Sequence, residues 1–355
     1  MHLHSTKRLV SATDSGSGCR MFTRRECLAL AATAVVSSAR VDADALPADN
    51  ALAKTMRGAF MILTTPFTES GAVDWDDLIR EVRFCDRAGV HGIVWPQGSS
   101  GVRYLTKEER MRGLEVLSKA RGQRTSLVFG VQGRDTAEML EYARRAEALA
   151  PDALIAMPPT TAKSLDEYLA YFRALGGVTG RPVIIQTSGG APSLTPTVDL
   201  IVSLAREFPH LGYVKEESQP IVERMKNELR QRPPLKAIFG ANFGANWLYE
   251  MRLGLDGVIT GNAMYGDVMA RMWTLHEKGD ADALRELFSR FLLMRNLAEQ
   301  IPGTDLYIMR KRGIFKATVV RGEGGPKALH FSTEEIAEIE YRFAALTPYL
   351  TATAG

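Results

Sequence analysis

The chain carries one lysine at the end of an apolar segment, where lysine is an unusual residue. Lys215 closes the segment HLGYVK, and because side chains alternate along a strand, it shares an inward face with Leu211 and Tyr213. Burial disfavours the charged form of an amine, and the neutral amine is the form that attacks a carbonyl to make a Schiff base. The alternative is a structural lysine that reaches solvent or pairs with Glu216 or Glu217, and residue types alone leave both interpretations open.

A second feature with chemical potential is the turn Gly98-Ser99-Ser100-Gly101. Glycines let backbone N–H groups approach an anion closely, and two hydroxyls add further donors, so the turn suits a small carboxylate. An ordinary serine–glycine turn has the same composition. Gln186 ends another apolar segment; its amide can donate and accept hydrogen bonds but cannot act as an acid or a base.

The remaining residue types exclude several kinds of site. The chain has three cysteines, and Cys19 and Cys27 lie near its N-terminus, which rules out a disulfide framework and a cysteine-based zinc site in the rest. The histidines have neither the spacing of metal ligands nor the placement of a Ser-His-Asp triad. No glycine-rich dinucleotide turn follows the first apolar segment. We therefore expect neither a metal nor a cofactor.

Eight short apolar segments alternate with amphipathic helical segments, and their starts lie about 20 to 35 residues apart. Near-continuous apolar strands indicate a parallel sheet buried on both faces. The pattern predicts the α/β class and a (β/α)8 TIM barrel, in which the carboxyl ends of the strands carry the chemistry. A doubly wound sheet is the alternative, disfavoured by the missing dinucleotide turn. The predicted strands begin at Gly58, His91, Thr125, Pro151, Arg181, His210, Leu235 and Leu255.

Helix start signals and composition divide the chain into four predicted parts. Hydroxyl–carboxylate pairs three residues apart, Thr106 with Glu109 and Ser164 with Glu167, are typical of helix starts. A C-terminal extension is predicted to hold three helices, over Ala281–Glu299, Asp305–Val320 and Ser332–Leu346. The four parts are a leader (1–45), a linker (46–56), the barrel (57–280) and the helical extension (281–350).

The N-terminal part has the layout of an export signal. Arg24-Arg25 precedes a weakly apolar run, Leu28 to Val36, and small residues follow it. This order predicts export by the twin-arginine route and a periplasmic location; a cytosolic tail on a cytoplasmic protein is the alternative. The apolar run is too short to span a bilayer, so we expect no membrane span after processing. Residues after 45 carry a net charge of +1, which argues against nucleic acid as a partner.

Several motifs together resemble the dihydrodipicolinate synthase/N-acetylneuraminate lyase family of Schiff-base lyases and aldolases. The resemblance covers roughly Arg57 to Leu346 and implies a small-molecule 2-oxo acid substrate and a homo-oligomer built as a dimer of dimers. It implies that Lys215 forms the Schiff base and that Ser99 relays protons. It implies that Ser100 and neighbouring amides, including that of Gly98, hold the carboxylate of pyruvate or a related acid, with a backbone contact from Ile259. The motifs are Thr64-Thr65-Pro66-Phe67, Gly98-Ser99-Ser100-Gly101 followed by Leu105 to Arg110, Gly212 to Glu216, and Gly257 to Gly261.

The chain departs from the family at three positions. Gln186 replaces the strand-five tyrosine that shuttles protons, Pro159 and Thr160 stand where the family has a tyrosine after strand four, and Ala191 replaces the arginine of the synthase branch. We therefore predict a lyase or aldolase that acts on pyruvate or another 2-oxo acid, in which Gln186 positions the substrate, and not dihydrodipicolinate synthesis. The alternative is an exported, non-catalytic 2-oxo-acid-binding protein on the same barrel.

Overall fold

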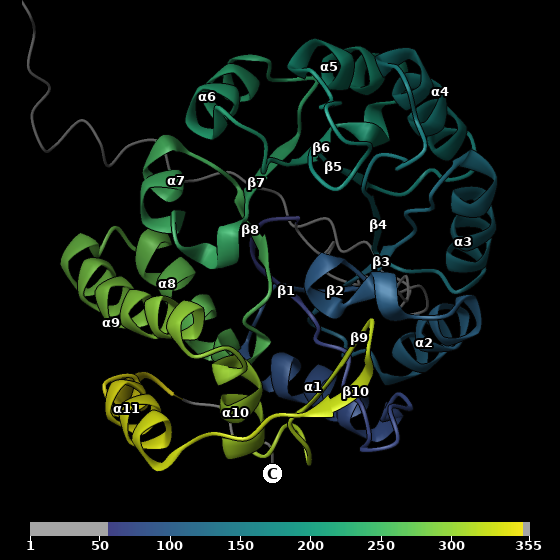
Figure 1. The fold of residues 1–355 in the computed structure, drawn as a ribbon. Helices are drawn as coiled ribbons and strands as arrows, with labels where there is room; N and C mark the ends of the chain where they lie inside the picture. The colour runs from purple at the N-terminus through teal and green to yellow at the C-terminus, as the bar shows by residue number, and fades with distance from the viewer. Residues whose placement is uncertain (1–55, 351–355) are drawn as a thin grey trace, which may run out of the picture. The chain divides into compact units, whose positions relative to one another are not determined.

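A computed structural model describes residues 56–350, and its core is a closed barrel of eight parallel strands (Figure 1). Each strand pairs with the next one along the chain, and β1 closes the ring by pairing with β8. This confirms the predicted (β/α)8 class. The strands are β1 (Gly58–Ile62), β2 (Gly92–Trp95), β3 (Ser126–Gly130), β4 (Ala153–Ala156), β5 (Val183–Gln186), β6 (Tyr213–Lys215), β7 (Ala237–Gly240) and β8 (Gly257–Thr260).

Eight helices surround the barrel, and several begin at the predicted caps. Thr106 accepts a hydrogen bond from the Glu109 amide, and the Glu109 carboxylate accepts one from the Thr106 amide. Ser164 also caps its helix, but the Glu167 carboxylate accepts from the Lys163 amide instead. The helices are α1 (Trp75–Ala88), α2 (Lys107–Ala120), α3 (Thr136–Ala148), α4 (Leu165–Gly176), α5 (Val198–Glu207), α6 (Ile221–Arg230), α7 (Trp247–Leu253) and α8 (Gly266–Glu277).

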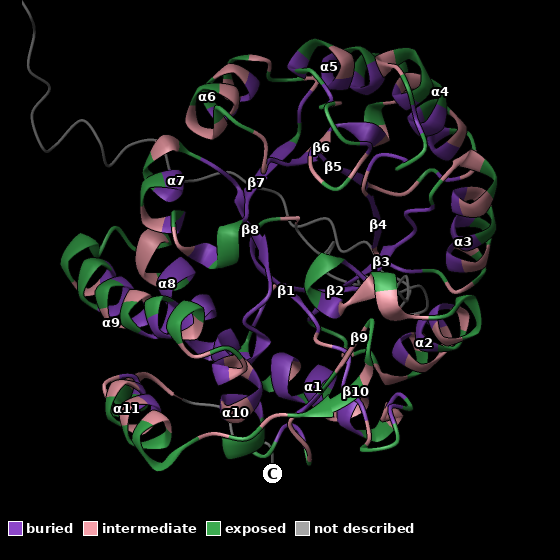
Figure 2. Cartoon of the chain, viewed as in Figure 1, coloured by how far each residue is buried: buried purple, intermediate pink, exposed green. Residues whose placement is uncertain are grey.

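The interior of the barrel is packed with apolar side chains. The residues of the eight barrel strands are buried, except for the half-buried Tyr213 (Figure 2). Phe60 and Phe239 meet edge to face across it, with ring centroids 5.3 Å apart. The interior is therefore a solid core, so any ligand must bind above it, at the carboxyl ends of the strands. The fully or nearly fully buried residues of this inner cluster are Phe60, Ile62, Val94, Val128, Ala153, Ile155, Ile184, Ala237, Phe239 and Ile259.

The prediction that Leu211 faces the interior of the barrel is wrong. Leu211 belongs to a short 3-10 turn, Pro209–Leu211, and packs in the outer cluster between strands and helices. Tyr213 packs against the inner cluster instead. The turn interrupts the alternation of side chains at Gly212, so the strand register begins only at Tyr213.

The C-terminal extension holds the three expected helices, α9 (Ala281–Gln300), α10 (Thr304–Lys311) and α11 (Thr333–Ala344), and also an antiparallel hairpin of β9 (Val319–Gly322) and β10 (Gly325–Ala328). The predicted helix over Asp305–Val320 is wrong beyond Lys311. Gly313 adopts a left-handed conformation with φ of 69° and ends the helical path. The β-branched pair Val319-Val320 then enters the hairpin.

Arg321 fastens the hairpin to the carboxyl end of the barrel. Its guanidinium forms two hydrogen bonds with the Glu109 carboxylate and also donates to the carbonyls of Gly71 and Tyr104. A planar guanidinium suits this bidentate contact. The hairpin therefore lies beside the start of α2, where it can wall the site above the barrel core.

Two predicted parts of the chain are not tested by this fold. The predicted leader 1–45 and nearly all of the linker 46–56 lie outside the described residues. Within residues 56–350, no helix is both long enough and apolar enough to cross a membrane. In the same range, no group of three histidine, cysteine or carboxylate side chains is arranged to hold a metal ion.

Candidate active site

Lys215 lies at the carboxyl end of β6 and points into the barrel. Tyr213, two residues earlier, packs against the inner cluster, so the alternation of side chains places Lys215 on the same face, one layer higher. The residue is only 4% exposed. Gln186, its register partner on β5, is equally buried. Both side chains therefore stand at the top of the apolar core, where the sequence predicted them.

The Lys215 ammonium belongs to a closed ring of four polar side chains. Its Nζ lies 3.3 Å from Oε1 of Gln186 and 3.1 Å from Oε1 of Glu217. The Gln186 amide nitrogen donates to the Ser188 hydroxyl at 3.1 Å, and that hydroxyl donates to Oε2 of Glu217. Of the two candidate partners, the lysine therefore takes Glu217 and not Glu216. Sequence reasoning missed Ser188, although it follows Gln186 by two residues and so shares its strand face.

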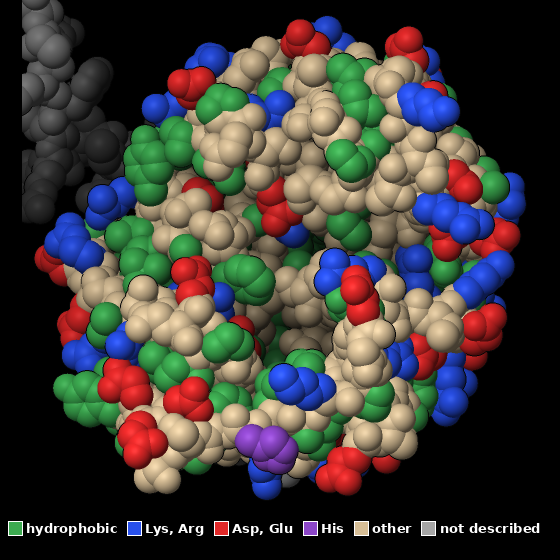
Figure 3. All heavy atoms as spheres, viewed as in Figure 1, with side chains coloured by type: hydrophobic (Ala, Val, Ile, Leu, Met, Phe, Trp, Pro, Cys, Tyr) green, Lys and Arg blue, Asp and Glu red, His purple; other side chains and the backbone are tan. Residues whose placement is uncertain are grey.

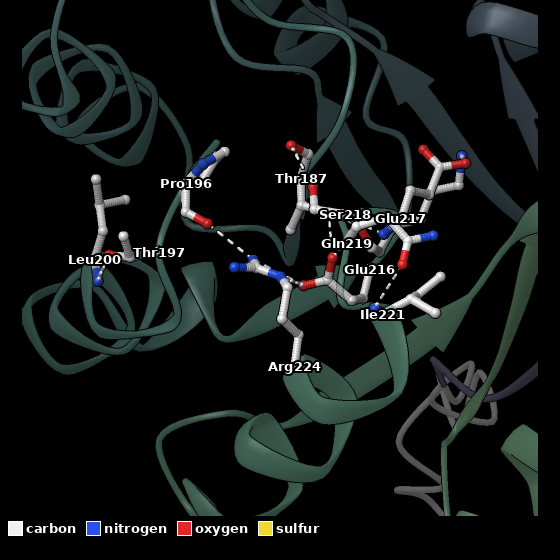
Figure 4. Close-up of polar contacts among 11 residues, drawn as sticks. Thr187, Pro196, Thr197, Leu200, Glu216, Glu217, Ser218, Gln219, Ile221 and Arg224 are labelled. Carbon is white, nitrogen blue, oxygen red and sulfur yellow. Dashed lines mark hydrogen bonds and ion pairs between the residues drawn. The ribbon is translucent and has the colours of Figure 1, made fainter. Parts of the chain in front are cut away.

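Glu216 points the opposite way and joins a buried network behind the site (Figure 4). Its side chain is fully buried, and Arg224 of α6 binds its Oε2 at 3.0 and 2.9 Å. Oε1 accepts hydrogen bonds from the Thr187 hydroxyl at 2.7 Å and the Ser218 amide at 2.6 Å. Thr187 also donates its amide to the Lys215 carbonyl. The network therefore fixes the backbone on both sides of Lys215.

A second carboxyl, Glu228 of α6, lies fully buried against Glu216. Burial and the neighbouring Glu216 carboxylate raise the pKa of Glu228 to about 10. No described donor binds either of its oxygens. Two carboxylates in contact are compatible only when one is protonated, so Glu228 holds a proton at neutral pH and shares it with Glu216.

This assignment predicts how stability changes with pH. The raised pKa means that the folded state keeps a proton on Glu228 that the unfolded state loses above its ordinary value of 4.5. Stability therefore falls as pH rises from that value towards 10. Glu228→Gln removes this loss, so the variant should gain urea resistance over the wild type by up to about 1.4 kcal/mol per pH unit. Urea midpoints from pH 5 to 9 measure it, and a constant difference across that range contradicts the shared proton.

The serine turn lies at the carboxyl end of β2 and forms a 3-10 helix, Gly98–Ser100. Ser100 is buried, and its hydroxyl donates to the Leu63 carbonyl at 2.6 Å and accepts from the Gln97 amide at 3.1 Å. The Thr65 hydroxyl donates to the Ser100 carbonyl. Ser100 therefore braces the turn, whereas Gly98 and Ser99 are exposed.

Two cavities flank this turn, and the molecular surface is hollowed over the centre of the barrel (Figure 3). The smaller one, ≈ 360 Å³, reaches Ser99, Ser100, Phe243 and the hairpin residue Val320. Lys215 does not line either cavity, and no contact joins its Nζ to the serines. Gly189, the chain neighbour of Ser188, lines the larger cavity of ≈ 680 Å³. That cavity is lined by Gly98, Gly101, Val102, Arg103, Tyr104, Arg110, Gln132, Gly133, Arg134, Met157, Pro158, Thr160 and Gly189.

The positions at which the chain departs from the resemblance lie in different surroundings. Thr160 and its neighbour Pro158 border the larger cavity after β4, whereas Pro159 is buried and does not line it. Ala191 is buried, and its amide donates to the Tyr168 hydroxyl at 2.8 Å. Ile259 lies on β8 with its side chain in the inner cluster. Tyr104, which sequence reasoning did not single out, lines both cavities and brings a phenol to the mouth of the barrel.

Comparison with known proteins decides the family. The family model described as the dihydrodipicolinate synthetase family matches residues 55–321, which hold the whole barrel, the lysine ring and the serine turn. The chain belongs to this family. The motifs that carried the resemblance in the sequence, from Thr64 to Gly261, all lie within the matched range.

Curated relatives and solved structures match this chain at low sequence identity. A 4-hydroxy-tetrahydrodipicolinate synthase of Chlorobaculum parvum is 30% identical over 209 residues, 58% of this chain and 70% of the relative. One of Chlorobium phaeobacteroides is 26% identical over 73% of this chain and 88% of the relative. Among solved structures, the dihydrodipicolinate synthase of Aquifex aeolicus has a TM-score of 0.72 at 20% identity, covering 84% of this chain and all of that one. A Clostridium difficile protein solved with mannosamine has the same score at 19% identity, covering 83% and 100%. The structural matches show the fold alone.

Proposed function

We propose that this member of the dihydrodipicolinate synthetase family is a Schiff-base-forming lyase or aldolase that acts on pyruvate or another 2-oxo acid. The observation that carries the proposal is the buried Lys215 amine at the top of the barrel core, held between Gln186 and Glu217. A buried amine facing the mouth of a barrel is placed to attack a carbonyl carbon. Dihydrodipicolinate synthesis itself is not proposed, although several relatives carry that name.

Each side chain has a distinct part in the proposed reaction. Lys215 forms a C–N bond with the keto carbon, and the resulting imine accepts the electron pair of the bond that breaks next to it. The exposed amides and hydroxyl of Gly98 and Ser99 orient the acid group, with Ser100 supporting the turn from below. Gln186 holds the lysine but moves no proton. Ile259 bounds the site from β8.

The larger cavity supports a substrate that extends beyond pyruvate. Two small residues, Pro158 and Thr160, line its wall, and the exposed side chains of Arg103 and Arg134 line it as well. An acidic or hydroxylated tail would meet these charges. A 2-oxo acid with such a tail, as in a sugar acid, is therefore the substrate class that we propose.

Borohydride trapping tests the proposal. The full-length protein is incubated with pyruvate or with longer 2-oxo acids and then reduced, which converts an imine into a stable secondary amine. We expect a mass increase on the peptide that contains Lys215. If no acid of the series gives an adduct on this peptide, the enzymatic proposal is wrong.

A non-catalytic binding protein is the second candidate, and Gln186 is the observation that favours it, since the proton-shuttling tyrosine of the family is missing. Exchange of the C3 protons of pyruvate in heavy water separates the two. An enzyme that interconverts imine and enamine exchanges them, whereas a binding protein leaves them in place.

Gln186 should control this exchange by holding Lys215. Gln186→Leu removes the oxygen that accepts from Lys215 and the amide that donates to Ser188. Because both side chains then lose their positions, we expect the exchange rate to fall about 10- to 100-fold. Nuclear magnetic resonance of the C3 signal measures the rate. Gln300→Leu, at an exposed glutamine of α9, serves as the matched control. An unchanged rate in Gln186→Leu would remove Gln186 from the site.

We also propose that the chain forms a homotetramer, a dimer of dimers, and is exported by the twin-arginine route. Three large apolar side chains, Leu293 of α9 and Ile336 and Tyr341 of α11, are exposed and support self-association. Light scattering measures the mass of the assembly in solution.

Replacing Arg24-Arg25 by lysines should retain the protein in the cytoplasm, and an unchanged distribution between cell fractions contradicts the export proposal.

A further inference from the structure

The carboxylate of Glu217 is the one ionisable group that contacts the Lys215 amine among the contacts of the described residues. Its Oε1 lies 3.1 Å from Nζ, within the range over which a proton passes directly between two groups. Its side chain is 24% exposed and that of Lys215 is 5% exposed, so the carboxylate is in contact with solvent while the amine is shielded. From this geometry we propose that Glu217 is the acid–base catalyst of Schiff-base formation.

Neighbouring groups cannot take this role. Gln186 has no proton to exchange at neutral pH. Glu216, the other carboxylate next to Lys215 in the chain, is bound by Arg224, Thr187 and the Ser218 amide and points away from the barrel. The hydroxyl of Ser188 is a weak acid, but it contacts Glu217 and fixes the direction of the carboxylate.

The ring of contacts orients the Glu217 carboxylate towards the Lys215 amine. Ser188 occupies Oε2, which leaves Oε1 to face the amine. The Glu217 amide donates to the Thr187 hydroxyl at 2.9 Å, so its backbone is tied to the segment that follows β5 as well. A preorganised acid–base group needs no rearrangement when the substrate binds. The strand alternation that makes Lys215 face inward also brings Glu217, two residues later, to the same side.

The proposed step balances in protons and electrons. Glu217 takes one proton from the Lys215 ammonium, and the neutral amine donates its electron pair to the keto carbon of the 2-oxo acid. The π electrons of the carbonyl move to its oxygen, which receives a second proton from the nitrogen. Glu217 then returns its proton to the new hydroxyl, the C–O bond breaks, and water leaves. The product is a protonated imine on Lys215, and Glu217 is a carboxylate again.

This inference rests on the proposed function and adds the proton carrier that the family tyrosine would otherwise supply. A carboxylate that follows β6 takes over the part of a phenol on β5. Gln186 leaves the site without the proton carrier that the resemblance implies at this position, and Glu217 brings another one to the same amine.

Rapid-quench borohydride trapping with pyruvate tests the inference on the full chain. We expect Glu217→Gln, which keeps the shape of the side chain, to slow adduct formation about 100-fold or more. Glu217→Ala should be equally slow and should recover speed as sodium formate is added, because a free carboxylate can enter the vacated space. Glu223→Gln, the same change at an exposed position of α6, should form the adduct at the wild-type rate. A merely structural role would give no rescue by formate.

The outcomes separate the two proposals. If the wild type forms an adduct and Glu217→Gln forms it equally fast, the acid–base role is wrong while the Schiff-base function stands. If Glu217→Ala is slow and formate leaves it slow, Glu217 acts only by holding its neighbours, and the inference is also overturned. If the wild type forms no adduct with any 2-oxo acid, the proposed function fails and this inference fails with it. Circular dichroism of each variant shows that it is folded.

Discussion

Replacing Lys215 by alanine should abolish the borohydride-trapped adduct and lower any lyase or exchange activity by about 10⁴-fold or more, the scale on which removal of a nucleophile acts. The reason is that no other described lysine stands at the top of the barrel interior with its amine among acceptors. Peptide mass spectrometry after reduction locates the adduct, and the C3 exchange rate measures the activity. The fold should persist, because Glu217 retains Ser188 as a partner and is partly exposed.

Lys236 provides the matched control for this substitution. It immediately precedes β7, so it lies at the amino end of the barrel, and it is exposed with its amine over the Tyr213 ring. Lys236→Ala should keep both the adduct and the exchange activity. An adduct that persists in Lys215→Ala, or that maps to Lys236 in the wild type, would contradict the assignment of the Schiff-base lysine.

Replacing Arg224 by methionine should destabilise the fold by about 3–5 kcal/mol, because it leaves the fully buried Glu216 carboxylate without its cation. Methionine preserves much of the packing volume, so the loss reports mainly on the charge. The Arg224 guanidinium also donates to the Pro196 carbonyl at 2.8 Å, and this contact to the segment before α5 is lost as well. Chemical denaturation at neutral pH measures the change.

Arg173→Met is the control for this second prediction. Arg173 of α4 binds Glu207 of α5 through two contacts, at 3.1 and 2.8 Å, but the two side chains are 49% and 41% exposed. Loss of such a surface pair lowers stability by only about 0–1 kcal/mol. Equal effects of the two substitutions would show that the Glu216 network does not depend on its buried charge.

The network has a further consequence for the active site. Glu216 sits between Lys215 and Glu217 in the chain, and its contacts anchor the strand end from outside the barrel. We therefore expect the same Arg224 variant, where it is folded, to form the Lys215 adduct more slowly than the wild type. A destabilised protein with an unchanged adduct rate would mean that the network supports the fold and not the site.

Local sequence patterns determined the architecture and the position of the candidate nucleophile. Alternating apolar segments and helix caps predict eight β/α units, since each unit depends on contacts near in the chain. The same alternation places Lys215 inward at the end of its strand. The alternation fails at Leu211, because a 3-10 turn before the strand shifts the pattern. The helical spacing fails at Val319, because a β-hairpin forms there instead of a helix.

Tertiary structure alone decided which partners the charged groups take. Lys215 has carboxylates at the next two positions, and the structure pairs Glu216 with Arg224 of α6 and Glu217 with the amine. The proton on Glu228 likewise depends on packing against Glu216, and the hairpin depends on Arg321 meeting Glu109, 212 residues away. Strand periodicity predicts on which face of the sheet a side chain lies. The partner of a charged group and its protonation state depend on groups brought together from distant parts of the chain.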